Sequence, residues 1–79
     1  MAPREVPFLA AVEFGRRVRS ARTDRGWSLE VLADHAGLHW TYVGSVERGR
    51  RNIALRNILK LAEALDLNPA ILVDGLRPG

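Results

Sequence analysis

Apolar residues recur at helical spacing along most of the chain, and this pattern predicts five helices. Phe14, Val18 and Ala21 stand at i, i+4 and i+7, which marks one face of a helix from Phe8 to about Asp24. No alternating pattern typical of strands competes with this interpretation. The predicted fold class is therefore all-α. The four later helices cover Leu29 to Ala36, Trp40 to Arg48, a segment carrying Leu55, Ile58, Leu59, Ala62 and Leu65, and Pro69 to Val73.

Residues that favour helix ends mark the limits of these segments. Ser28 is a good N-cap for the second helix, and Gly37 can end it in the left-handed conformation. Asn68 and Pro69 are typical of an N-cap and a first helical residue, and Pro7 suits the first turn of the first helix. Two short helices joined by a glycine-containing turn must cross steeply, which is the helix-turn-helix arrangement. The second helix of such a pair can enter the major groove of DNA.

The predicted third helix has two distinct faces. Stepping 100° per residue places Val43 and Val46 on its inward side. The opposite side is small and polar with a single base, so it could approach the edges of DNA bases. That outward side carries Thr41, Gly44, Ser45 and Arg48, with Trp40 at its edge.

Basic residues are concentrated in two zones of the chain. The net charge is +3, but residues 1–26 carry +3, residues 27–47 carry −3, residues 48–60 carry +5 and residues 61–79 carry −2. This distribution favours a polyanionic partner. Eleven of the twelve basic residues are arginine, which is typical either of nucleotide bias in a genome or of a protein that binds phosphates and guanine.

The length of 79 residues favours one domain, which we place at residues 8–76 between an N-terminal arm (1–7) and a C-terminal tail (77–79). The longest apolar stretch, Phe8 to Val12, is far too short for a membrane span and is flanked by Glu5 and Glu13. It is equally unlike a signal peptide. We therefore expect a cytoplasmic protein without a membrane partner.

Metal binding and catalysis find little support in the residue types. The chain has no cysteine, and Gly37 interrupts the helical spacing between its two histidines, His35 and His39. Neither a nucleophile elbow nor a glycine-rich phosphate loop is present. We expect no enzyme activity, no metal and no cofactor.

From about Phe14 to Leu72 the chain resembles the Cro/repressor-type (XRE-like) helix-turn-helix family, within which it looks most like the controller proteins of restriction–modification systems. This resemblance implies a lambda-repressor-like DNA-binding domain of five helices. The residues that carry the likeness are Phe14–Arg19, Arg22, Gly26–Ser28, Leu32–Ala33, Thr41–Val43, Val46–Ile53 and Leu61–Leu65.

The resemblance implies roles at the matching positions. Base-facing positions correspond to Trp40, Thr41, Gly44 and Ser45. Arg48, which the family pattern places beside phosphates, is expected to contact bases because it stands on the outward side of the third helix. Positions that face phosphates correspond to Ser28, Leu29, Tyr42, Arg50, Arg51 and Asn52. An internal ion pair of the family corresponds to Arg22 and Glu47, and it would tie the first helix to the end of the third.

Two of these positions depart from the family pattern. Leu29 and Trp40 stand where many relatives have polar residues, so neither position keeps its hydrogen-bonding capacity. We expect the two to pack together, with specificity shifting to Thr41, Ser45 and Arg48. For Trp40, contact with a base or sugar and local packing both remain open.

The C-terminal part of the chain predicts a dimer. Leu61 widens the apolar arc of the fourth helix, and the residues after it add more apolar surface than a short last helix can bury alone. A twofold pair would cover this surface and place two third helices about 34 Å apart, one turn of DNA. The expected interface consists of Leu61, Leu67, Ile71, Leu72 and Leu76.

These observations predict a homodimeric, sequence-specific regulator that binds double-stranded DNA at a near-palindromic operator and controls its own expression. Two alternatives stay open at this point: an antitoxin of a toxin–antitoxin pair, and a protein-interaction module without DNA binding. RNA polymerase and a toxin protein are the further partners that the resemblance suggests.

Overall fold

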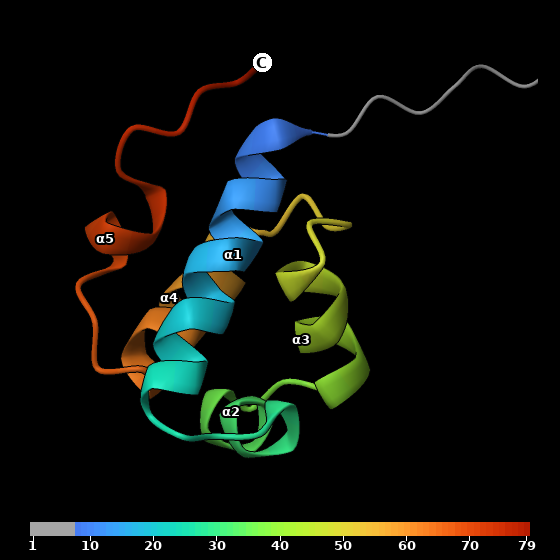
Figure 1. The fold of residues 1–79 in the computed structure, drawn as a ribbon, viewed down its shortest axis with the longest axis vertical. Coiled ribbons are helices and arrows are strands. Elements are labelled where there is room, and N and C mark those ends of the chain that lie inside the picture. The colour runs from blue at the N-terminus through green and yellow to red at the C-terminus, as the bar shows by residue number, and fades with distance from the viewer. Residues whose placement is uncertain (1–7) are drawn as a thin grey trace, which may run out of the picture.

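The computed structural model describes residues 8–79, and within them the chain forms five helices and no strand (Figure 1). The predicted all-α, five-helix fold is confirmed. The N-terminal arm (1–7), and with it Pro7, lies outside the described residues. The helices are α1 (Leu9–Asp24), α2 (Leu29–Ala36), α3 (Trp40–Glu47), α4 (Leu55–Ala64) and α5 (Pro69–Val73).

The capping residues end the helices as their chemistry predicts. The Ser28 hydroxyl accepts a hydrogen bond from the Val31 amide at 3.2 Å, and the Asn68 side chain accepts one from the Ala70 amide at 3.0 Å. Gly37 ends α2 with φ of 67°, a left-handed conformation that glycine adopts without strain. The bounds of α2 and α5 therefore agree with the predicted ones.

The third helix starts at Trp40 as predicted but ends one residue early. It ends at Glu47 rather than Arg48, because Arg48 has left the helical conformation (φ −82°, ψ 1°) where the chain turns toward Gly49. Its first turn is capped by the His39 ring, whose Nδ1 accepts a hydrogen bond from the Thr41 amide at 3.2 Å. Histidine is a rare cap, so helix-end preferences do not predict this role for His39.

The core is formed by apolar side chains from all five helices. α1 contacts α3 and α5, while α2 contacts α3 and α4, and α4 also contacts α5. In Figure 1, α4 lies behind α1, and α3 and α5 flank α1 on opposite sides. The inward face predicted for α3, with Val43 and Val46, is confirmed. The buried core residues are Phe14, Val18, Leu32, Ala33, Ala36, Val43, Val46, Leu61, Ala62, Leu65 and Leu72.

Two residues assigned to a dimer interface belong to this core instead. Leu61 and Leu72 have no exposed surface in a single chain, so their assignment to the interface was wrong. The reason is that α5 packs back onto α1 and α4, which turns Leu72 inward. Ile71 points outward and is 56% exposed, whereas Leu67 and Leu76 are partly buried against the core.

The close crossing of α1 and α3 depends on Gly15. A Cβ atom at this position would lie 2.2 Å from the carbonyl oxygen of Val46 and 2.7 Å from that of Glu47. Such distances are far below van der Waals contact, and both atoms belong to the backbone. Only glycine at position 15 allows the C-terminal end of α3 to lie this close to α1.

Candidate nucleic-acid interface

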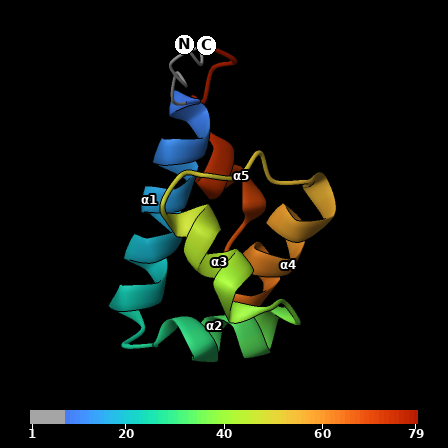
Figure 2. The ribbon, with the colours of Figure 1, turned by 90° about the vertical axis from the view of Figure 1, so that its right-hand side faces the viewer.

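The α2–α3 pair forms the outermost layer of one side of the molecule. Three residues, Gly37 to His39, join the two helices, and α2 runs across the lower end of α3 in Figure 2. α3 faces the viewer there, with α1 and α4 to either side of it. The loop that follows α3 leads away from its upper end toward α4. Among residues 8–79, no other helix covers one long side of α3.

The first turn of α3 is organised by His39. Its Nδ1 lies 2.6 Å from the Thr41 hydroxyl, and its ring stacks on that of Trp40 with 6.0 Å between centroids. Trp40 is nevertheless 50% exposed, and Thr41 is exposed as well. His39 therefore fixes the orientation of two of the predicted base-facing side chains, a role that sequence reasoning missed.

Gly44 does not lie open to solvent as the sequence predicted. It is buried, because the side chains of Arg48 and Leu29 cover it. A Cβ atom on Gly44 would lie 3.2 Å from Nη1 of Arg48 and 3.5 Å from Cδ1 of Leu29. Its assignment as a base-facing residue was wrong, since position on the outer face of a helix does not guarantee exposure when long neighbours fold over a glycine.

Arg22 and Glu47 form a bidentate ion pair between α1 and the last residue of α3. Nε and Nη2 of Arg22 donate to the two carboxylate oxygens of Glu47 at 2.7 and 2.9 Å, and Nη1 donates to the Trp27 carbonyl at 2.8 Å. The side chains are only 12% and 5% exposed. The hydrogen bond to Glu47 raises the pKa of Arg22 above its usual value. The pair thus locks the end of α3 to α1.

The same ion pair shapes the charge of the outer surface. Glu47 is the sole acidic residue between Asp34 and Glu63, and its carboxylate is buried against Arg22. Residues 40–52 therefore present no exposed carboxylate of their own. They do present the exposed side chains of Arg48, Arg50, Arg51 and Asn52. Ser45 is half-buried, and Ser28 is exposed while its hydroxyl caps α2.

Tyr42 connects α3, the following loop and α4. Its hydroxyl accepts a hydrogen bond from Nδ2 of Asn57 at 3.1 Å, and the Arg51 guanidinium lies 5.4 Å from the centroid of its ring. A cation over an aromatic ring is attracted by its quadrupole. Tyr42 thereby steadies Arg51 at the surface. Asn57 was missed, because only the folded loop brings it to Tyr42.

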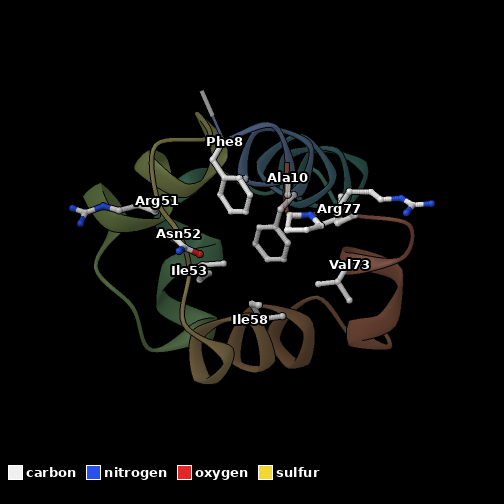
Figure 3. A pocket seen from close by; sticks show the side chains of 12 residues that line it. Phe8, Ala10, Arg51, Asn52, Ile53, Ile58, Val73 and Arg77 are labelled. Carbon is white, nitrogen blue, oxygen red and sulfur yellow. The ribbon is translucent and has the colours of Figure 1, made fainter. Parts of the chain in front are cut away.

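A mainly apolar cavity of about 320 Å³ lies between the start of α1, the α3–α4 loop, α4 and the C-terminal segment (Figure 3). The rings and methyl groups of Phe8, Ile53, Ile58 and Val73 line it. The guanidinium ends of Arg51 and Arg77 point away from it in opposite directions. The charged end of Arg51 is therefore directed to the outer surface rather than into the cavity.

Residues 8–79 contain no group of three or more histidine, cysteine, aspartate or glutamate side chains that could hold a metal ion. In particular, the His35 ring stacks on Trp27 with 4.5 Å between centroids. Over the same range, none of the helices combines the length and apolar character needed to cross a membrane.

The sequence matches known proteins over most of its length. The helix-turn-helix family model matches residues 18–72. The control protein C.BamHI of Bacillus amyloliquefaciens is 44% identical to the chain over 62 residues, which cover 77% of this chain and 76% of that protein.

Solved structures show the same fold. The restriction–modification controller protein C.AhdI of Aeromonas hydrophila superposes with a TM-score of 0.80 and 54% identity, covering 82% of this chain and 98% of that one. The biofilm master regulator SinR, solved in complex with DNA, gives a TM-score of 0.74 and 32% identity over 77% of this chain and 98% of that one.

Proposed function

Because the chain belongs to the helix-turn-helix family, we propose that it is a sequence-specific DNA-binding transcriptional regulator in which α3 lies in the major groove. Controller proteins of restriction–modification systems are similar to it over most of its length, and SinR, a more distant relative, was solved with DNA bound. The proposed regulator is of the controller or repressor type.

The observation that carries this proposal is the surface formed by residues 40–52. It combines an uncovered helix, small polar side chains and exposed arginines, and its one carboxylate is buried in an ion pair. DNA binding needs such a surface, because positive charge attracts the phosphates while short side chains let the helix approach the base edges.

We assign the contacts to the surface as follows. Bases are contacted by Trp40, Thr41, Ser45 and Arg48. The phosphate backbone is contacted by Ser28, Leu29, Tyr42, Arg50, Arg51 and Asn52. At Ser28 and Leu29 the contact involves the N-terminal amides of α2, whose helix dipole favours an anion.

Selection from random duplexes tests the proposed function directly. We expect the protein to enrich one sequence. Its affinity should fall steeply as the salt concentration rises, with a slope of log K against log salt concentration of about −0.9 for every phosphate neutralised. A failure to enrich any sequence, together with an affinity independent of salt, would favour a protein-interaction module instead.

The proposed regulator acts as a homodimer on a near-palindromic operator. Ile71 is the most exposed residue of the expected interface, and the partly buried Leu67 and Leu76 stand four residues before it and five residues after it. An exposed isoleucine on a short terminal helix is removed from water when a second copy covers it. Two copies would then present two α3 helices to successive turns of the major groove.

Sedimentation at micromolar concentration tests the dimer. We expect a dimeric wild type and a monomeric Ile71→Glu variant with weaker DNA binding. Leu55→Glu is the matched control, because Leu55 is also an exposed aliphatic residue (70% exposed) but lies on α4. A monomeric wild type, or loss of the dimer in the Leu55 variant alone, would contradict the α5 interface.

We also propose that the protein controls its own expression through its concentration. Dimerisation makes DNA occupancy depend steeply on the amount of protein, so no separate ligand is needed for regulation. A reporter fused to the DNA upstream of its own gene should change its output as the protein accumulates. A constant output at all protein levels would contradict autoregulation.

A further inference from the structure

Gly44 and Arg48 stand one helical turn apart and lie against each other. A Cβ atom on Gly44 would lie 3.2 Å from Nη1 and 3.9 Å from Cζ of Arg48. The Arg48 side chain is therefore folded back along α3, with its guanidinium over the backbone of Gly44 instead of extended beyond the end of the helix. This places a positive charge near the middle of the outward face.

The side chain of Leu29 also lies next to the position that a Cβ atom of Gly44 would take. Its Cδ1 atom would lie 3.5 Å from a Cβ of Gly44. A leucine side chain has no hydrogen-bond acceptor, so it leaves the donors of the neighbouring guanidinium free for another partner. Within residues 8–79, Arg48 makes no ion pair or side-chain hydrogen bond, and its side chain is exposed.

The backbone itself does not require glycine at position 44. Gly44 lies inside α3 and does not have positive φ, so alanine would suit its conformation and favour the helix. What glycine provides is the absence of a Cβ atom beneath the guanidinium. This differs from Gly15, where the added atom would meet backbone rather than the end of a flexible side chain.

We propose that Gly44 is a positioning residue, and that the Arg48 side chain it holds reads a guanine in the major groove rather than a phosphate. The inference rests on the proposed function, since it requires α3 to face DNA. An arginine fork can donate to O6 and N7 of guanine together, and this pairing depends on close alignment. A Cβ at position 44 would displace the fork outward by a few tenths of an ångström.

The test compares four proteins on the sequence selected by the wild type: wild type, Gly44→Ala, Arg48→Ala and the double variant. We expect Gly44→Ala to melt at the same or a higher temperature and to keep its salt dependence. It should lose about tenfold of its preference for guanine at one base pair of each half-site, the same pair that Arg48→Ala affects. The double variant should lose no more than Arg48→Ala alone.

Arg50→Ala is the matched control, because Arg50 is a neighbouring exposed arginine on the loop. It should weaken all duplexes alike. If Arg48→Ala behaves in the same uniform way and also flattens the salt dependence, Arg48 contacts a phosphate and the inference fails while the proposed function stands. An effect of Gly44→Ala that persists without Arg48 would also overturn it. Failure of the wild type to select any sequence would instead refute the proposed function itself.

Discussion

The two sides of α3 are built differently. Its inward side is fixed to α1 by backbone contact at Gly15 and by the buried Arg22–Glu47 pair, both of which leave almost no room for change. Its outward side carries the exposed side chains of Trp40 and Thr41, and the loop that follows carries Arg51, whose guanidinium lies over the Tyr42 ring. None of the residues that fix the helix to α1 (Gly15, Arg22 and Glu47) is among those proposed to touch DNA. Substitutions on the inward side should therefore lower stability, and those on the outward side should alter binding without lowering stability.

The largest expected effect comes from removing the carboxylate of the buried pair. Glu47→Ala should lower the free energy of unfolding by about 3–5 kcal/mol, because it leaves the Arg22 guanidinium buried without its partner. DNA binding should fall as well, since the end of α3 is released. Chemical denaturation followed by circular dichroism measures the change.

Glu63→Ala is the control for this variant, because Glu63 is an exposed glutamate on α4. It should leave stability nearly unchanged. An unaltered melting temperature for Glu47→Ala would show that the pair does not fix α3, and the contrast between the two sides of the helix would disappear.

The second largest effect is expected at Gly15. Gly15→Ala should destabilise the fold by about 1–3 kcal/mol, because the added methyl must push α3 away from α1. In a helix with no close neighbour, replacing glycine by alanine would raise the free energy of unfolding. A decrease for Gly15→Ala therefore shows that α1 and α3 cross closely at this residue. Comparing its melting temperature with that of Gly44→Ala sets the two sides of α3 directly against each other. Equal or raised stability in both would contradict the inward constraint.

On the exposed loop that follows α3, Arg51→Ala should change binding and not stability. We expect the free energy of unfolding to stay within about 0.5 kcal/mol of wild type, as for other surface substitutions. Affinity for all duplexes should fall alike. The slope of log K against log salt concentration should become less steep by about one for each phosphate that the variant no longer neutralises. The measurement is a set of binding isotherms at several salt concentrations.

Arg77→Ala serves as its control, because the guanidinium of Arg77 points in the opposite direction across the cavity (Figure 3). It should leave the salt dependence as it is. Equal flattening in both variants would show that the effect reflects total charge and not the surface of residues 40–52.

The smallest effect is expected at an ion pair on the solvent side of α1. Glu13 accepts hydrogen bonds from Arg16 at 2.7 and 2.8 Å and from Arg17 at 2.8 Å, and these lower its pKa from 4.5 to about 2. A carboxylate with a lowered pKa stabilises the fold above pH 4.5, and this contribution fades as the pH falls toward 2. Because these two ion pairs lie at the surface, with the Arg16 side chain 66% exposed, salt screens them and their contribution is small.

Denaturation midpoints of the wild type and Glu13→Gln, measured from pH 6 down to about pH 2, test this expectation. The small advantage of the wild type should shrink as the pH falls and should be reduced by added salt. A difference that stays constant over this range would mean that the carboxylate charge is not its source.

The sequence was sufficient for features that depend on local chemistry. The start of α2 follows from the Ser28 cap, and its end follows from the left-handed turn at Gly37. Both features depend on only a few neighbouring residues. The inward faces of α2 and α3 follow in the same way from helical spacing. The bidentate contact between Arg22 and Glu47 involves residues distant in sequence, and resemblance to a family was what suggested it.

Features that depend on packing between distant segments could not be obtained in this way. Leu61 and Leu72 look like surface leucines until α5 folds onto α1 and α4. Gly44 looks exposed on the helix until Arg48 and Leu29 fold over it. The need for glycine at position 15 exists only because α3 crosses α1 there. In each case the deciding neighbour belongs to another element or is a long side chain whose direction the sequence does not specify.

The placement of the two tryptophans gives the molecule two separate optical reporters. Trp27 is enclosed between the His35 ring, 4.5 Å away, and the Arg25 guanidinium, 4.8 Å away, at the turn between α1 and α2. Trp40 stands half exposed at the start of α3, on the surface proposed to meet DNA. The emission of Trp27 therefore follows unfolding, whereas that of Trp40 follows contact with a nucleic acid. A Trp40→Phe protein isolates the unfolding signal of Trp27, and the difference between its emission and that of the wild type isolates the binding signal of Trp40.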